Sequence, residues 1–351
     1  MYWKLTVRRK DGNSQVETRN DDIDIIKGML VVTMVIYHCA SMAKTTYPEL
    51  GSISNCLVFL HYAFLLITGF LCGWYYLPKL RTSPQAVRAR LRLRAGKIIA
   101  VFMLMNLFLY SVGGTLSYEK LRNSANSFDN IMQNFILSVS GKLVAFQILF
   151  PIAIFLWIAS LLLGRVSIPV MLSLIIFASI AGCFSGTIMF VAFGMVGMFF
   201  GILTRTCILN VFWKWIKQHK WLPPMLLLVY LLNLSRVRWL VTVLQPLKLV
   251  VYTAESFFWF ATFLVVVEFF IGLKIRDIVI KLGRYTLFAY LAQMLIIRLN
   301  YVIIRKMEIS GSSYYLINLT ISIIILFFVI VFLDVLRHRY STIDDLYRIV
   351  F

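Results

Sequence analysis

Charged side chains are scarce in this sequence of 351 residues. Only 14% of the residues are Asp, Glu, Lys or Arg, whereas 60% are hydrophobic. A soluble protein of this length cannot bury so large an apolar fraction in its core, so the composition excludes a soluble globular protein and indicates a polytopic membrane protein. No stretch between the apolar runs is long enough to form a separate soluble domain.

Acidic residues are the scarcer of the two signs. There are 15 Asp and Glu against 35 Lys and Arg, which leaves a formal net charge of +20. Such an excess can indicate a nucleic-acid partner, but in a membrane protein it more often reflects basic loops beside anionic lipid. We therefore expect a lipid bilayer as a partner and no nucleic acid.

The sequence also lacks the short motifs of soluble enzymes and metalloproteins. Its five cysteines have no disulfide or metal-ligand spacing, so we expect no metal site. There is no Gly-x-Ser-x-Gly elbow and no phosphate-binding loop. Internal repeats, which are common in transporters, are absent as well. The polar first residues contain no cleavable signal peptide.

Ten apolar runs remain, each near the length that crosses a hydrocarbon core. Most of the 35 Lys and Arg fall on one side if the N-terminus is cytoplasmic, which is the asymmetry expected of cytoplasmic loops. The expected fold is therefore an all-α polytopic membrane protein with about ten transmembrane helices and both termini in the cytoplasm. The predicted spans are 25–43, 55–77, 97–113, 141–163, 166–184, 187–203, 222–235, 249–273, 285–304 and 314–335.

The same pattern predicts the domain organisation. Residues 1–24 form a cytoplasmic N-terminal segment, residues 25–335 a single transmembrane domain, and residues 336–351 a cytoplasmic tail.

The first apolar run carries two strongly polar residues. It follows Asn20, Asp21 and Asp22, whose short side chains suit the first turn of a helix. Lys27 and His38 are eleven residues apart, so both lie on one helix face, roughly 16 Å apart along the axis. One interpretation is an anchoring lysine and a packing histidine; the other is a functional pair.

The segment IDIIKGMLVVTMVIYH resembles the first helix of the integral-membrane acyltransferase 3 family. That family has an Asp, a basic residue and a Gly, followed by apolar residues and a His. Asp24, Lys27, Gly28 and His38 stand at these positions. In the second run, Thr68-Gly69-Phe70 resembles the family's Ser-Gly-Phe, and Gly69 is also the kind of residue that lets two membrane helices approach closely.

A basic cluster precedes the third run, where the family also has one. Arg94-Ala-Gly-Lys97 resembles its Arg-x-x-Arg. Arginine holds phosphate through paired N–H donors, so Arg92, Arg94 and Lys97 are candidates for binding the phosphates of coenzyme A. Alternatively, the cluster only orients the protein and contacts lipid. The full cluster is Lys79, Arg81, Arg88, Arg90, Arg92, Arg94 and Lys97.

Other polar residues within the runs are candidates too. A carboxylate at membrane depth is costly, so Glu255 is a functional hypothesis, with a buried pair to Arg298 or Lys248 as the alternative. His61 is a second intramembrane histidine that either binds substrate or bonds a neighbouring helix. Near the end, Gly283, Tyr285, Thr286, Tyr290 and Leu291 resemble the family's last motif.

Three positions depart from the family's pattern. Gln147 is the nearest polar residue to the place where many members have a Glu, Ala100 replaces a Pro, and Gln293 replaces a His. These departures leave open the alternative that the protein is a relative of the family that binds its ligands but has lost acyltransferase activity.

The resemblance implies a membrane-bound O-acyltransferase of the bacterial inner membrane. It would move an acyl group, most often acetyl, from acyl-CoA to a hydroxyl of a carbohydrate or lipid-linked glycan, with no bound cofactor. His38 would be the general base, because imidazole titrates near neutral pH, and Glu255 would orient it or the acceptor hydroxyl. A transporter or flippase of a lipid-linked sugar is the alternative. The substrate-binding candidates are Lys27, Arg92, Arg94, Lys97, Asp24 and His61.

Overall fold

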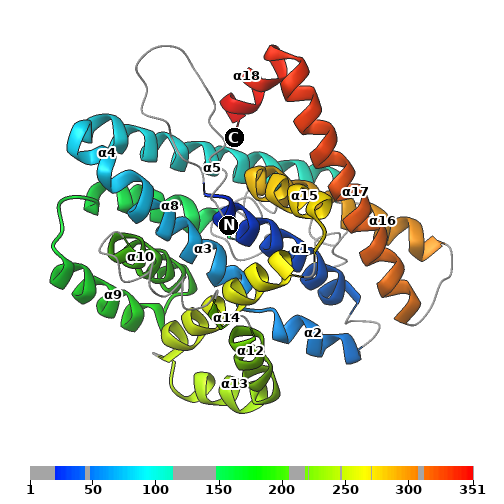
Figure 1. Ribbon diagram of the computed structural model, residues 1–351, viewed down its shortest axis with the longest axis horizontal. Coiled ribbons are helices and arrows are strands. Elements are labelled where there is room, and N and C mark those ends of the chain that lie inside the picture. The colour runs from blue at the N-terminus through cyan, green and yellow to red at the C-terminus, as the bar shows by residue number, and fades with distance from the viewer. Residues whose placement is uncertain are drawn as a thin grey trace, which may run out of the picture.

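The computed structural model of the chain describes residues 20–43, 48–113, 148–204, 218–219, 221–245, 247–269, 271–306 and 312–350. Every regular element within these ranges is a helix, and none of the described residues forms a strand (Figure 1). The predicted all-α class is therefore confirmed for this part of the chain. Gln147 lies outside the described residues.

The helices follow the order of the predicted apolar runs. They are α1 (Asp21–Ala43), η1 (Pro48–Leu50), α2 (Gly51–Cys56), α3 (Leu60–Leu71), the π-helical turn η2 (Cys72–Tyr76), α4 (Leu77–Thr82), α5 (Pro84–Gly113), α8 (Leu149–Leu162), α9 (Ile168–Gly182), α10 (Gly186–Thr204), α12 (Leu222–Leu232), α13 (Leu234–Val243), α14 (Leu247–Phe269), α15 (Leu273–Arg284), α16 (Thr286–Lys306), α17 (Ser312–Arg339) and α18 (Ser341–Val350).

Five helical stretches are long and apolar enough to cross a membrane. They are α1, the continuous stretch Gly51–Leu80, α10, α14 and nearly all of α17, and they indicate a multi-pass membrane protein. Three further apolar helices, α8, α9 and the first part of α16, are shorter. The predicted span 222–235 is not one straight helix, because α12 ends at Leu232 and α13 continues after a bend of 68°. The total of ten spans stays a prediction.

The surface of α17 has the composition expected for contact with lipid. A stripe of large apolar side chains recurs every three or four residues, which places them on one helix face. All of them are exposed, and an apolar stripe of this length is unfavourable in water. Its members are Ile321, Ile324, Phe328, Phe332 and Val335.

Helix α1 lies in the middle of the bundle (Figure 1). It packs against α3, α14, α15, α16 and α17, and residues such as Leu30, Val31 and Val35 are completely buried. Helix α15 crosses it closely through two glycines. A Cβ on Gly28 would overlap the backbone carbonyl of Val279, and one on Gly283 would overlap that of Asp24.

Helices α3 and α10 are packed backbone to backbone. A Cβ on Gly69 would overlap the carbonyl oxygen of Gly194, and one on Gly197 would overlap that of Leu66. The predicted close approach at Gly69 is thus confirmed. The sequence contains more evidence for this close packing than Gly69 alone. Gly69 and Gly73 are four residues apart and face similarly spaced glycines on α10, a pattern typical of closely packed helix pairs in membranes.

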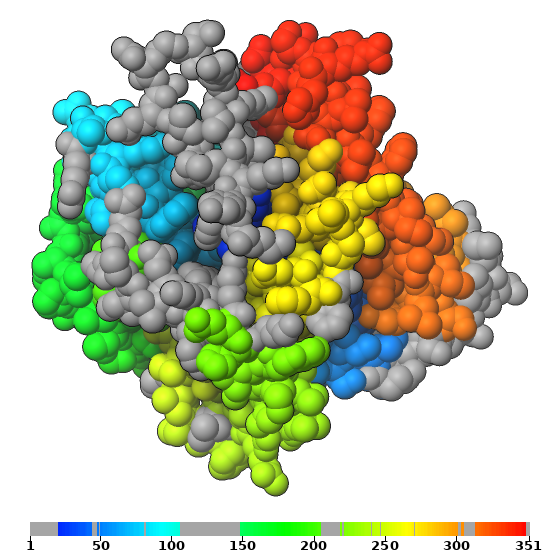
Figure 2. Space-filling view, viewed as in Figure 1, coloured from blue at the N-terminus to red at the C-terminus, as the bar shows by residue number. Residues whose placement is uncertain are grey.

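The segment predicted as the cytoplasmic tail, residues 336–351, is largely helical up to Val350. It contains the end of α17 and all of α18. Arg337 forms an ion pair with Asp344, and its guanidinium lies 3.9 Å from the ring centre of Tyr347. These contacts hold α18 against the end of α17 at one end of the molecule (Figures 1 and 2).

The basic part of α5 and the α12–α13 pair lie at opposite ends of the bundle (Figure 1). Figure 2 shows α15 and α18 at the surface of the first end, and α12 and α13 at the surface of the other. We expect reporter fusions or engineered cysteines at the exposed positions Gln85 and Gln245 to be accessible from opposite sides of the membrane. Accessibility of both positions from one side contradicts the predicted topology.

Candidate functional site

His38 lies in the last third of α1. Its Nε2 is buried and has no hydrogen-bond partner among the described residues. The ring of Tyr37 stands edge-on to it, with centroids 5.2 Å apart, and His61 and Arg298 are close enough to interact with it electrostatically. A buried imidazole nitrogen without a partner is costly in a protein interior, so it points to a group supplied from outside the described residues.

His61 on α3 belongs to the same cluster. Its ring lies edge-on to Tyr37, again with centroids 5.2 Å apart, so Tyr37 contacts both histidines. Nδ1 lies 3.3 Å from the backbone carbonyl of Val58. Because the carbonyl can only accept, Nδ1 carries the proton in the neutral ring and Nε2 is left as the basic nitrogen. The structure thus brings together two histidines that the sequence singled out separately.

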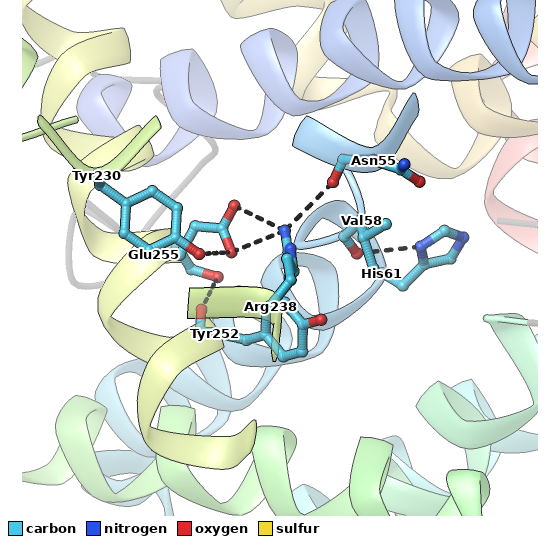
Figure 3. Close-up of polar contacts among 8 residues, drawn as sticks. Asn55, Val58, His61, Tyr230, Arg238, Tyr252 and Glu255 are labelled. Atoms are coloured by element: carbon cyan, nitrogen blue, oxygen red, sulfur yellow. Dashed lines mark hydrogen bonds and ion pairs between the residues drawn. The ribbon is translucent and has the colours of Figure 1, made fainter. Parts of the chain in front are cut away.

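Glu255 on α14 is completely buried and held by two side chains. Tyr230 donates its hydroxyl to Oε2 at 2.8 Å, and Nη2 of Arg238 lies 3.3 Å from both carboxylate oxygens (Figure 3). The partner is therefore neither Arg298 nor Lys248, the two candidates from the sequence. Nor does Glu255 bond to Nε2 of His38, which has no partner; a catalytic role for Glu255 stays a prediction.

Arg238 and Tyr230 are site residues that the sequence did not predict. Arg238 lies in the segment assigned to an outer loop, and Tyr230 is one aromatic residue in a long apolar run. Arg238 comes to Glu255 because α13 turns back after the bend that follows α12. An arginine in an outer loop, where few basic residues are expected, was the only signal available.

Asp24 and Lys27 form an ion pair at the other end of α1. Lys27 Nζ lies 2.7 Å from Asp24 Oδ1, and the two are three residues apart on one helix face. Arg284 on α15 approaches the same carboxylate at 3.8 Å and that of Asp21 at 3.6 Å. The Lys27 ammonium is therefore largely neutralised by protein and is not a bare charge for a substrate.

The arginines of α5 divide into two stripes. At about 100° per residue, Arg90 and Arg94 share one side with Lys97, whereas Arg92 lies on the other side of the buried Leu91. Arg92 and Arg94 are exposed, but Lys97 donates to the carbonyl of Arg348 in α18 at 2.6 Å. The three candidates for phosphate binding therefore do not form one surface, and the Lys97 ammonium is hydrogen-bonded to α18.

No family model, no curated protein and no solved structure matches the chain. The resemblance to the acyltransferase 3 family consequently stays an expectation, and the geometry has to carry any functional argument.

Gln293 on α16 is another buried group without a partner among the described residues. Its side chain is 1% exposed, and neither its Oε1 nor its Nε2 has a hydrogen bond within the described part of the chain. Tyr290, one turn earlier on α16, lies near Tyr37, so this helix faces the histidine cluster. Ala100, another departure from the family's pattern, is exposed on α5.

The described residues contain no group of three or more His, Cys, Asp or Glu side chains that could hold a metal ion.

Proposed function

We propose that the protein is a membrane-bound O-acyltransferase that moves an acyl group from acyl-CoA to a hydroxyl of a carbohydrate or lipid-linked glycan. The observation that supports this most is the buried, unpartnered Nε2 of His38. A general base needs a nitrogen that no protein donor occupies and that a substrate hydroxyl can reach. A bacterial inner membrane is the proposed location, because the resemblance to that enzyme family implies it.

The chemistry assigned to His38 is a single proton transfer with an acyl transfer. Nε2 accepts the proton of the acceptor hydroxyl while the oxygen attacks the thioester carbonyl. The C–S bond breaks, the acyl group stays on the acceptor oxygen, and the coenzyme A thiolate leaves and takes up the proton. Tyr37, which contacts both rings, and the tautomer fixed at His61 position this cluster.

The donor is proposed to enter from the end that carries the basic part of α5. Arg90, Arg92 and Arg94 are exposed there, and no hydrogen bond or ion pair joins them to another described residue. The phosphates of acyl-CoA are anions that such guanidinium groups bind well. Arg94 is also close enough to interact with Cys72, where the π-helical turn η2 begins, a kind of irregularity that is frequent at functional sites.

Purified protein incubated with a panel of acyl-CoAs tests the proposal. We expect release of coenzyme A, slow with water alone and faster with a glycan acceptor, and no release by protein with His38 replaced. A transporter or flippase would release no coenzyme A from any donor. Vesicles that move a lipid-linked sugar without any thioester cleavage would support that alternative instead.

Replacement of the exposed arginines tests the donor site. Arg94→Ala and Arg92→Ala are each expected to raise KM for acyl-CoA roughly ten- to hundredfold, since a charge-assisted contact is worth about 1.5–3 kcal/mol. Arg165→Ala is the matched control, because Arg165 is an exposed arginine in the turn after α8. Variants that change only expression or orientation, with KM unaltered, indicate that the cluster is a topology signal.

A further inference from the structure

Arg238 uses only one of its three nitrogens. Nη2 makes every contact, 3.3 Å to each oxygen of Glu255 and 3.3 Å to the carbonyl of Asn55. Nε and Nη1 are buried and have no acceptor among the described residues. The guanidinium lies over the ring of Tyr252, 4.5 Å from its centre, which fixes its plane (Figure 3).

This arrangement leaves three N–H donors of a cation without an acceptor. An unpaired charged donor in a protein interior is costly, so buried guanidinium groups are usually saturated by oxygen atoms. Glu255 does not satisfy them, because its oxygens accept from the hydroxyl of Tyr230 and from Nη2, and Nε and Nη1 do not reach it. The donors therefore call for an oxygen-rich group that the described chain does not provide.

The local charge has the sign that such a group requires. Lys248, at the start of α14, lies with its Nζ 5.6 Å from the ring centre of Tyr62, and Tyr62 stacks on Tyr252 at 4.6 Å. Arg238 and Lys248 contribute two positive charges and Glu255 one negative charge, so the described cluster has one uncompensated positive charge. A group with a single negative charge balances it.

We propose that Arg238 and Lys248 bind one anionic group, a phosphate or a carboxylate, of the molecule that accepts the acyl group. Calling this molecule the acyl acceptor rests on the proposed function, whereas the binding of an anion at Arg238 does not. The acceptor would then be an acidic or phosphorylated glycan, and Arg238 and Lys248 would select it over neutral sugars.

The end of α2 and the turn after it link this anion site to the histidines. The carbonyl of Asn55 accepts from Arg238, and that of Val58, three residues later, accepts from His61. The two carbonyls are thus three residues apart in the chain, at the end of α2 and in the turn that leads to α3. A glycan anchored at Arg238 would therefore lie beside the short segment whose Val58 carbonyl holds His61.

Cys56 offers a readout that needs no activity. It is partly exposed and is close enough to interact electrostatically with Arg238 and Glu255, so an occupied site should shield it. Alkylation of Cys56 by N-ethylmaleimide is followed by peptide mass spectrometry in a phosphate-free detergent, with Cys183, directly after α9, as the internal reference. Glucuronate, glucose 1-phosphate, glucose and phosphatidylglycerol are the added probes.

We expect glucuronate and glucose 1-phosphate to slow alkylation of Cys56, and glucose to have no effect. Arg238→Gln should raise the half-protecting concentration about ten- to hundredfold, the factor for one charge-assisted hydrogen bond. Lys248→Gln, which leaves the pair of Arg238 and Glu255 intact, should raise it about two- to fivefold. Arg236→Gln is the matched control on α13, because Arg236 is exposed and lies on another side of the helix; it should leave protection unchanged.

Several outcomes overturn the inference. One is equal protection by glucose, and another is no protection by either anionic sugar. Unchanged protection of Cys56 in folded Lys248→Gln protein also overturns the inference, even if the Arg238→Gln protein fails to fold. Protection by phosphatidylglycerol alone shows that the site binds a lipid headgroup and excludes the acyl acceptor as its ligand. Acyl transfer is measured on the same samples: transfer without anion protection refutes this site alone, and protection without transfer refutes the enzyme.

Discussion

His38→Gln is expected to lower the rate of acyl transfer about 10²–10⁴-fold, the usual contribution of a positioned general base. Glutamine keeps much of the size and the hydrogen-bonding capacity of histidine but cannot take up a proton near neutral pH. Because Nε2 of His38 has no partner to lose among the described residues, the substitution should leave the protein folded. The rate is measured as coenzyme A release by purified, monodisperse protein at saturating acyl-CoA.

His61→Gln is the companion variant. Its imidazole is already tied to the carbonyl of Val58, and we expect a smaller loss of rate, arising from a displaced Tyr37. A near wild-type rate in His38→Gln protein refutes the assignment of the base. If His61→Gln then shows the large loss, the base is His61 and its Nε2 has the role proposed for His38.

Gly69→Val is expected to destabilise the folded protein by about 3 kcal/mol, the upper part of the usual range for overpacking. The atoms that the new side chain would meet are the carbonyl of Gly194 and the backbone of Met198, neither of which can turn aside as a flexible side chain would. The valine therefore has to push α3 and α10 apart. Loss of the monodisperse species after heating in detergent measures the effect.

Gly96→Ala is the matched control for this substitution. A Cβ on Gly96 meets nothing within 4 Å, and α5 is helical there, so alanine should be neutral or stabilising by roughly 0.5–1 kcal/mol. If Gly69→Val protein is as heat-resistant as the wild type, the close contact between α3 and α10 is wrong.

Local patterns in the sequence were sufficient for much of the fold. The first helix begins at Asp21, where Asn20 accepts a hydrogen bond from the backbone N–H of Asp22 at 2.9 Å, as expected for a helix start. The predicted third span begins at residue 97, yet α5 already begins at Pro84 and includes most of the basic cluster. The arginines of α5 lie on both sides of a buried apolar stripe that contains Leu91. This pattern is typical of a helix, but the segment is too polar to be recognised as a transmembrane span.

The site depends more on tertiary placement. The pair of Asp24 and Lys27 follows from their spacing, because residues three apart share a helix face. By contrast, nothing near Glu255 in sequence identifies Arg238 as its partner. That contact exists because α13 folds back over the start of α14, and a bend after Leu232 is not encoded by any proline at that point. Likewise, Lys97 meets Arg348 only because the chain's last helix returns to α5.

The ion pair between Asp24 and Arg284 also constrains how many times the chain between them crosses the membrane. Residues in contact lie on one side of the bilayer, so the chain between them crosses an even number of times. If the seven other predicted spans between these residues each cross once, the predicted topology requires one further crossing between the end of α10 at Thr204 and the start of α14 at Leu247. A helix pair bent by 68° can also return to the side from which it came. In the predicted topology, a chain that returned without this further crossing would leave Asp24 and Arg284 a membrane's thickness apart, although the two are an ion pair.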